Sequence, residues 1–346
     1  MTSLAIIAAL LLDQLLGEPR RWHPLVGFGA LVTRVEAALR RDHHPPWRQQ
    51  LAGALAWSLL AAVPALGLAL LSVALGGWPP AAVEVSGLGS GDILADDAFG
   101  FSALRAGGWS GGVPLCLEVL VLYLALGRRS LGEHARAVAA PLLAGDISGA
   151  RRRVAMIVSR DTAHLDAAGA TRATVESVLE NGSDAVLAPL FWFAVAGAPG
   201  ALLYRLANTL DARWGYRSSR YRFFGRPAAR LDDALNWLPA RLCALAYGLA
   251  GNPASALRCW RRQAPQAASP NAGPVMAAGA GALGIRIGGP TRYRGREDWR
   301  PILGAGRAAE PRDIPRALTL VDRATLLWVA AIALAELACH LAVLPP

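Results

Sequence analysis

Three acidic residues recur at four-residue intervals in the middle of the chain. Glu176, Glu180 and Asp184 would share one face of a continuous α-helix. Like charges on one face repel, so a metal cation or several arginines must neutralise them. Oxygen ligands suit Mg²⁺, which proteins hold through one or two carboxylates together with substrate phosphates. The competing interpretation is a solvated face paired with Arg172 and its neighbours, and spacing alone favours it.

Two further candidates lie just upstream of these acids. Asp161 is a candidate to join the metal site, although it or Thr162 would equally cap a helix. His164 is a candidate general base or phosphate contact. A lone histidine is more often structural, so its assignment to chemistry is a hypothesis.

A second polar cluster follows an apolar run. Asn208 and Asp211 are spaced i, i+3, and Asp232 and Asn236 are spaced i, i+4, so both pairs are expected to face one polar cavity. Between them, arginines alternate with aromatic residues. That mixture is typical of a phosphate pocket, a nucleic-acid surface or a membrane interface. The candidate phosphate contacts within it are Arg217 and Arg220.

A third cluster is rich in glycine and reads SPNAGPVMAAGAGALG over residues 269–284. Ser269, Asn271 and Gly273 are candidates for a loop that presents backbone N–H groups to an anion. The segment is neither a Walker loop nor a dinucleotide-binding glycine motif. Its small residues would equally allow close helix packing.

The charged residues restrict the available chemistry. The formal net charge is +10, and every basic residue counted in it is an arginine. The absence of lysine excludes a P-loop lysine, a Schiff base and a lysine nucleophile. Phosphate contacts must therefore come from arginine, backbone N–H groups or metal. The four cysteines have no CxxC spacing. Because the arginines flank apolar runs, membrane topology explains them better than nucleic acid does.

The elements that must position these residues are predicted to be membrane helices. Hydrophobic residues make up 54% of the chain and charged residues 17%, against about 25% charged in soluble domains. Residues 51–76 carry no charge and are long enough to cross a bilayer, and residues 324–344 are a second candidate. Residues 113–127 are a weaker one, and residues 4–16 indicate an uncleaved anchor.

The rest of the chain predicts amphipathic helices and loops. Helices are expected over residues 135–153, 161–184 and 254–263, and a loop over 284–309. Residues 77–112 indicate a variable external loop. Residues 186–203 are apolar between arginine-rich flanks, and Pro189 with the GAPG at 197–200 favours a re-entrant segment over a full crossing returned by 237–251.

These observations predict an all-α, polytopic integral membrane protein with amphipathic and re-entrant helices and a polar site on the cytoplasmic side. We expect one domain over residues 1–346, with the motifs concentrated in 128–323.

Several long motifs, taken together, resemble the CobD/CbiB family, the adenosylcobinamide-phosphate synthases of cobalamin biosynthesis. The resemblance covers nearly the whole chain in order, except for residues 77–112. The motifs that carry it are LLLDQLLGEPRRWHPLVGFG (10–29), LGRRSLGEHA (126–135), SRDTAHLD (159–166), VESVLENGSDAVLAPLF (175–191), YRLANTLDARWGYRSSRYRFFG (204–225), ARLDDALNWLPARL (229–242) and SPNAGPVMAAGAGALG (269–284).

The resemblance implies a multi-pass enzyme of the bacterial inner membrane that ligates (adenosyl)cobyric acid to (R)-1-aminopropan-2-ol or its O-phosphate. ATP and Mg²⁺ are the expected cofactors. The expected partners are the two substrates, the lipid bilayer and other corrin-pathway enzymes at the membrane, with no nucleic acid. Two other functions stay open: a non-catalytic, AmpE-like membrane signalling protein and a corrin transporter.

Amide formation needs an activated carboxylate and cations against the phosphates. The roles of individual residues are hypotheses that go beyond the resemblance. We assign metal binding to Asp161, Glu176, Glu180 and Asp184. We assign catalysis to His164, Asp211, Asp232 and Asn236. We assign substrate and phosphate binding to Arg160, Asn181, Asn208, Arg217, Arg220, Ser269, Asn271 and Gly273.

Overall fold

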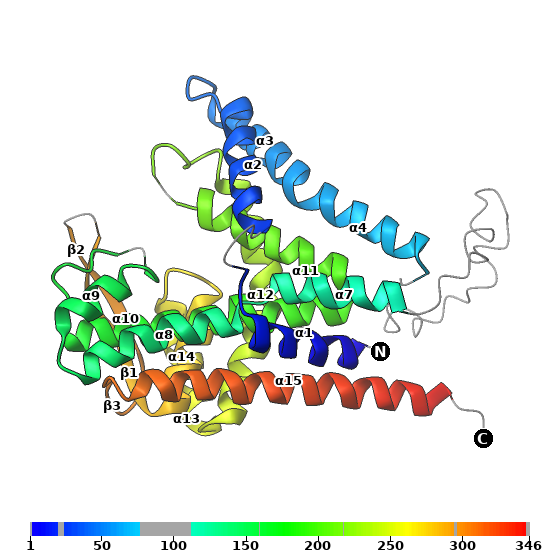
Figure 1. The fold of residues 1–346 in the computed structure, drawn as a ribbon. Helices are drawn as coiled ribbons and strands as arrows, with labels where there is room; N and C mark the ends of the chain where they lie inside the picture. The colour runs from blue at the N-terminus through cyan, green and yellow to red at the C-terminus, as the bar shows by residue number, and fades with distance from the viewer. Residues whose placement is uncertain are drawn as a thin grey trace. The chain divides into compact units, whose positions relative to one another are not determined.

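The computed structural model describes residues 2–19, 24–76, 112–158, 160–216, 218–293 and 296–343. The chain is mostly helical (Figure 1). It divides into two compact units, each assembled from separate stretches of sequence. Most of the predicted external loop at 77–112 lies outside the described residues, and its last residue, Gly112, begins a helix.

The first unit contains residues 1–126, 189–232 and 331–346. Its core joins side chains that are distant in the sequence, including Val32, Leu60, Leu210 and Phe224. Its elements are α1 (Thr2–Leu16), α2 (Pro24–Leu39), α3 (Pro46–Trp57), η1 (Ser58–Ala62), α4 (Val63–Ala74), α7 (Gly112–Ala125) and most of α11 (Ala188–Trp214).

The second unit contains residues 127–188 and 233–330. Its helices pack around the small residues of α14 (Ala272–Leu283), most of which are fully buried. Its other elements are α8 (Arg128–Leu143), α9 (Ile147–Val154), α10 (Ala167–Gly182), η2 (Ser183–Leu187), most of α12 (Arg226–Ala250), α13 (Pro253–Gln263), η3 (Ala264–Gln266), three strands and the first part of α15 (Asp313–Val343).

The three strands correct the prediction of a loop over residues 284–309, and with it the all-α fold class. The strands β1 (Ile285–Tyr293), β2 (Arg296–Gly304) and β3 (Arg307–Ala308) form a sheet in the order β2-β1-β3. The first pair is antiparallel and the second parallel. Glycine and proline interrupt the alternation of apolar and polar residues in β1, which hides the strand in the sequence. They lie at or beside a register shift between Ile287 and Gly289.

Two π-helical turns precede prolines inside long helices. The η1 turn ends two residues before Pro64, and η2 ends two residues before Pro189. Proline removes one helical hydrogen bond and crowds the carbonyl four residues earlier, and a wider turn relieves that crowding. The Ala185 carbonyl, to which Pro189 cannot donate, instead accepts the Gly127 N–H at 3.0 Å.

The predicted break in the apolar run 186–203 is confirmed, at its glycine end. Within α11, Ala196 (φ −136°, ψ 22°) and Gly197 (φ 59°, ψ −156°) are non-helical, so two helices meet at a kink there. The positive φ of Gly197 is a conformation that glycine adopts without strain. Pro189 is the second residue of α11, directly after η2, and does not end the helical run.

Three helices are long and apolar enough to cross a membrane by length and composition: Pro46–Ala74, Ala167–Trp214 and Asp313–Cys339. They include the two strongest segments expected from the sequence. The first carries a row of large apolar side chains that are each about half exposed or more: Leu51, Leu55, Leu59, Leu66 and Leu70. Apolar faces of this kind are typical of lipid contact. Residues 4–16 and 254–263 are helical as predicted, in α1 and α13.

Candidate active site

The second unit holds a buried carboxylate between two arginines and a strand. Glu176 on α10 accepts hydrogen bonds through Oε2 from Arg160 Nη2 at 2.5 Å and Arg300 Nη1 at 2.7 Å. Its Oε1 accepts the Gly288 N–H at 2.8 Å. The Glu176 and Arg160 side chains are only 4% and 8% exposed. Both oxygens of Glu176 are therefore engaged, and the predicted metal ligand is part of an ion-pair network.

Gly288 brings the strand close enough to reach this carboxylate. It has a φ of 85°, and a Cβ at this position would overlap the Pro301 carbonyl on β2. Glycine is therefore required by both backbone conformation and space. Gly288 lies at the register shift of the antiparallel pair β1 and β2, and its N–H and the Arg300 guanidinium both donate to the same acid.

Glu180 lies one helical turn after Glu176, within electrostatic range of Glu176, Arg160 and Arg300. Its carboxylate makes no hydrogen bond or ion pair with another residue in the described parts of the chain. Of the two acids in this cluster, Glu180 is therefore the one available to a ligand.

The third predicted metal ligand does not continue this face. The α-helix ends at Gly182, and Asp184 lies in the π-helical turn η2. A π-turn inserts one extra residue and so rotates the side chains after it around the helix axis. Asp184 is accordingly close in electrostatic terms to Cys243 and Tyr247 of α12. The expected i, i+8 alignment is wrong for this reason.

Asp161 and His164 lie in the turn that precedes α10. Asp161 Oδ1 accepts the Ala163 N–H at 3.2 Å, which is a local turn. The helix is capped by Asp166, whose side chain accepts the Gly169 N–H at 2.6 Å, and so the predicted cap at Asp161 or Thr162 is wrong. His164 is exposed. Asn181 is exposed too, and donates to the Ser177 carbonyl at 2.9 Å.

No group of three or more His, Cys, Asp or Glu side chains is arranged to hold a metal ion among the described residues. The sequence left either a metal cation or arginines to neutralise these acids. The structure places two arginines, Arg160 and Arg300, beside Glu176. Metal binding by Asp161, Glu176, Glu180 and Asp184 remains a prediction, and the engaged Glu176 oxygens do not fit it.

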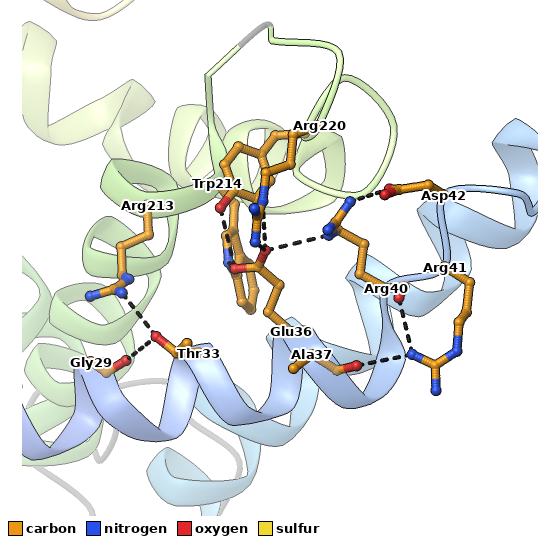
Figure 2. A network of polar contacts seen from close by, with 11 residues as sticks. Gly29, Thr33, Glu36, Ala37, Arg40, Arg41, Asp42, Arg213, Trp214 and Arg220 are labelled. Atoms are coloured by element: carbon orange, nitrogen blue, oxygen red, sulfur yellow. Dashed lines mark hydrogen bonds and ion pairs between the residues drawn. The ribbon is translucent and has the colours of Figure 1, made fainter.

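The first unit has its own carboxylate network, shown in Figure 2. Glu36 on α2 accepts Arg220 Nη2 at 2.7 Å and Nε at 3.1 Å through Oε1. Its Oε2 accepts Trp214 Nε1 at 3.1 Å and the Tyr221 hydroxyl at 3.3 Å. Arg40 Nε adds an ion pair at 3.4 Å. Arg220, a predicted phosphate contact, thus fastens the segment between α11 and α12.

Neighbouring candidates in this unit have mixed outcomes. Arg213 donates to Thr33 Oγ1 at 3.1 Å, also visible in Figure 2. Arg217 lies outside the described residues. Asn208 Nδ2 donates to Asp232 Oδ1 at 3.4 Å, so the structure brings these two predicted residues together.

The remaining members of the second predicted cluster lie on α11 and α12. Asp211 lies in the last turn of α11, where its carbonyl accepts the Gly215 N–H at 2.7 Å. Asn236 follows Asp232 by one turn on α12 and is 2% exposed. Their predicted catalytic roles remain predictions.

The predicted anion loop is the start of α14, and its backbone N–H groups form hydrogen bonds within the same turn. Ser269 Oγ accepts the N–H groups of Asn271 and Ala272 at 3.3 and 3.1 Å, and the Ser269 carbonyl accepts the Gly273 N–H at 3.2 Å. Pro274 has no N–H. The backbone donors expected to hold an anion are therefore already used within the turn.

Sequence reasoning missed Glu36, Gly288 and Arg300, which form many of these contacts. The last two belong to strands in a segment expected to be a loop. Glu36 was hidden because its hydrogen-bond partners Trp214, Arg220 and Tyr221 follow it by 178 to 185 positions. A single acid among several arginines, as in the segment around Glu36, is the signal that would have found it.

Taken together, the fold and site define a mostly helical protein with candidate membrane spans and two arginine–carboxylate networks. Residues 6–321 match the family described as CobD/Cbib protein. The chain therefore belongs to the CobD/CbiB family, and the resemblance predicted from its motifs is confirmed.

Three relatives match over at least 90% of both chains. A protein of Chromobacterium violaceum is 51% identical over 95% of both chains, and one of Stutzerimonas stutzeri is 51% identical over 94% of this chain and 95% of its own. A Mycobacterium tuberculosis protein is 38% identical over 92% and 90%. Each is named "Cobalamin biosynthesis protein CobD". No solved structure matches the chain.

Proposed function

We propose that this protein acts in cobalamin biosynthesis, as a membrane ligase that forms an amide bond. Its substrates would be (adenosyl)cobyric acid and (R)-1-aminopropan-2-ol or its O-phosphate, and its product (adenosyl)cobinamide or the phosphate. The observation that carries this proposal is the 51% identity over 95% of both chains to a relative named for cobalamin biosynthesis.

The cluster around Glu176 suits the charges of such a reaction. A carboxylate substrate and its activated form are anions, and guanidinium groups bind such oxygens through two parallel N–H donors. Glu176 holds Arg160 and Arg300 in place and neutralises part of their charge. In this proposal the two arginines face the acyl group, and Glu176 positions them without touching the substrate.

Glu180 is the base that this arrangement favours. The amine arrives protonated and must lose a proton before its nitrogen attacks the acyl carbon of the activated carboxylate, where the C–N bond forms as the acyl C–O bond breaks and phosphate leaves. Glu180 is beside both arginines and has a carboxylate without a hydrogen-bond partner in the described chain. His164 is exposed in a turn, and Asp232 already accepts the Asn208 amide. The proposal therefore places the proton on Glu180 rather than on either of those residues.

ATP and Mg²⁺ are part of the proposal through the chemistry of amide ligation, in which ATP supplies the activation of the carboxylate. Among the described residues no three His, Cys, Asp or Glu side chains are grouped to hold a metal ion, and both oxygens of Glu176 accept hydrogen bonds. No step is therefore assigned to a protein-bound metal. Mg²⁺ carried by the nucleotide phosphates is compatible with this arrangement.

The test is an assay of the purified, full-length protein with cobyric acid, aminopropanol or its phosphate, ATP and Mg²⁺, from which each component is omitted in turn. Product mass distinguishes cobinamide from its phosphate. We expect product only when corrin, amine and ATP are all present. Absence of product under every combination would refute the ligase proposal and favour an accessory role.

A further inference from the structure

A pocket of about 450 Å³ lies in the second unit, away from Glu176, between α12, α13 and the turn before α14. Its volume is within the range of about 300–1,000 Å³ typical of small-molecule sites. Prolines 265, 270 and 274 and several alanines form apolar walls, and Trp260 adds an aromatic surface. Its charged lining residues are two arginines, Arg241 and Arg261, and no acid lines it.

Arg241 is held rigidly at this pocket. Its Nη1 donates to Asn271 Oδ1 at 2.6 Å and its Nη2 to the Pro270 carbonyl at 2.9 Å. Its guanidinium carbon lies 4.8 Å from the centre of the Trp237 ring. Asn271 is itself fixed by donating to the Asp233 carbonyl at 2.8 Å. The cation therefore has a defined position before any ligand arrives, which reduces the entropic cost of binding.

The positive charge of Arg241 is uncompensated. Its described partners are all neutral oxygens, and no carboxylate in the described chain forms an ion pair with it. Burial lowers the pKa of Arg241, although arginine remains charged at neutral pH. A partly buried cation without a counterion favours an anionic ligand.

Arg261 supplies a second cation from the last turn of α13, and its side chain is exposed. The helix is fastened at this end, because Gln263 exchanges two hydrogen bonds with Gly304 of β2, at 3.0 and 2.7 Å. Two guanidinium groups on well-anchored helices can donate hydrogen bonds to several oxygens of one phosphate.

We propose that this pocket binds the phosphate group of an organic phosphate, with the organic part against the prolines and Trp260. Water occupies about 30 Å³ per molecule in the liquid, so the pocket has room for much more than an inorganic ion. The choice between two carriers of that phosphate, a nucleotide and the phosphorylated amine, rests on the proposed function. In this inference the phosphate is bound by Arg241 and Arg261, and not by backbone N–H groups of Ser269, Asn271 and Gly273 as the sequence predicted.

The test measures ligand binding without turnover. The full-length protein in detergent is titrated calorimetrically with ATP, with aminopropanol O-phosphate and with inorganic phosphate, without corrin. We expect one of the two organic phosphates to bind more tightly than inorganic phosphate, and Arg261→Gln to weaken it about tenfold, which corresponds to about 1.4 kcal/mol. Arg261 is exposed, so this variant should fold.

The matched control is Arg262→Gln, which removes the same charge from the neighbouring, exposed position that does not line the pocket. We expect it to change the affinity less than twofold. An equal loss in both variants, or no binding of either organic phosphate to the wild type, would overturn the inference. Arg241→Lys, which keeps the charge without the planar fork, is expected to weaken binding as well.

These outcomes are separable from those of the ligase assay. If amide formation occurs and Arg261→Gln leaves the affinity for both organic phosphates unchanged, the pocket inference fails and the ligase stands. If an organic phosphate binds in an Arg261-dependent way and no amide is formed, the ligase fails and the pocket stands.

Discussion

Glu176 and Arg300 meet at 2.7 Å although they are 124 positions apart in the chain. This contact joins α10 to the hairpin of β1 and β2, and Arg160 completes it from the turn before α10. The arrangement assigns Glu176 to positioning and leaves Glu180 for chemistry. Substitutions at the two acids should therefore have different effects on stability and on turnover.

Glu176→Gln should destabilise the protein by about 3–5 kcal/mol, because it leaves two poorly solvated arginines without their counter-charge. Denaturant or thermal unfolding in detergent measures this. Glu133→Gln is the matched control: its pair with Arg129 at 2.7 Å is between side chains 51% and 32% exposed. Exposed pairs contribute about 0–1 kcal/mol. Equal stability losses in the two variants would contradict the network.

Glu180→Gln should abolish amide formation while expression and membrane insertion stay normal, and the sequence-based hypothesis for Asp211 predicts the same of Asp211→Asn. For Glu180 the reason is loss of the base, so substrate binding should persist when turnover is gone. Product formation is measured by mass spectrometry, with binding measured separately. Glu133→Gln again serves as the control. Turnover like that of the wild type in both variants would remove the proposed catalytic site.

Arg220→Lys should loosen the segment between α11 and α12. Lysine cannot reproduce the two bonds from Nε and Nη2 to Glu36. We expect faster amide hydrogen exchange over residues 215–225. The control is Arg222→Lys, two residues away, because the Arg222 side chain stacks on Phe223. Its amide exchange should match that of the wild type. Unchanged exchange in Arg220→Lys would show that Glu36 does not hold this segment.

Gly53→Ala should destabilise the first unit, because a Cβ there would overlap the Phe224 carbonyl, and backbone atoms cannot move aside easily. Gly67→Ala is the matched control farther along the same long helix, where the space around a Cβ is open. Alanine is favoured over glycine in a helix by about 0.5–1 kcal/mol. We therefore expect opposite signs for the two changes in unfolding free energy.

Cys243 should resist alkylation in the native protein. Burial raises the pKa of its thiol to about 12, so the reactive thiolate is scarce at neutral pH and grows only as the pH approaches that value. Cys259 is also buried, whereas Cys116 and Cys339 are exposed in the chain. Mass spectrometry after maleimide treatment should find Cys243 modified only after denaturation. Rapid native labelling of Cys243 would place it in a more open environment.

The helices were predictable wherever one local pattern dominated. The uncharged run at 51–76 and the amphipathic run at 254–263 fold as their composition indicated. Gly197 sits at the predicted break of the apolar run, because few other residues tolerate its backbone angles. The hairpin at 285–304 was not predictable, because glycine, proline and arginine obscure the alternation that marks a strand.

The sequence alone determined the family, the mostly helical character and which segments concentrate acids, amides and arginines. It could not assign partners, since helix spacing describes only neighbours on one element. The tertiary structure decided that Arg160 and Arg300 form ion pairs with Glu176, and that Arg220 forms one with Glu36. It also decided that the Ser269 side chain accepts a backbone N–H of its own turn. The physical reason is that a buried charge requires a counter-charge, and chain folding alone determines which distant residue supplies it.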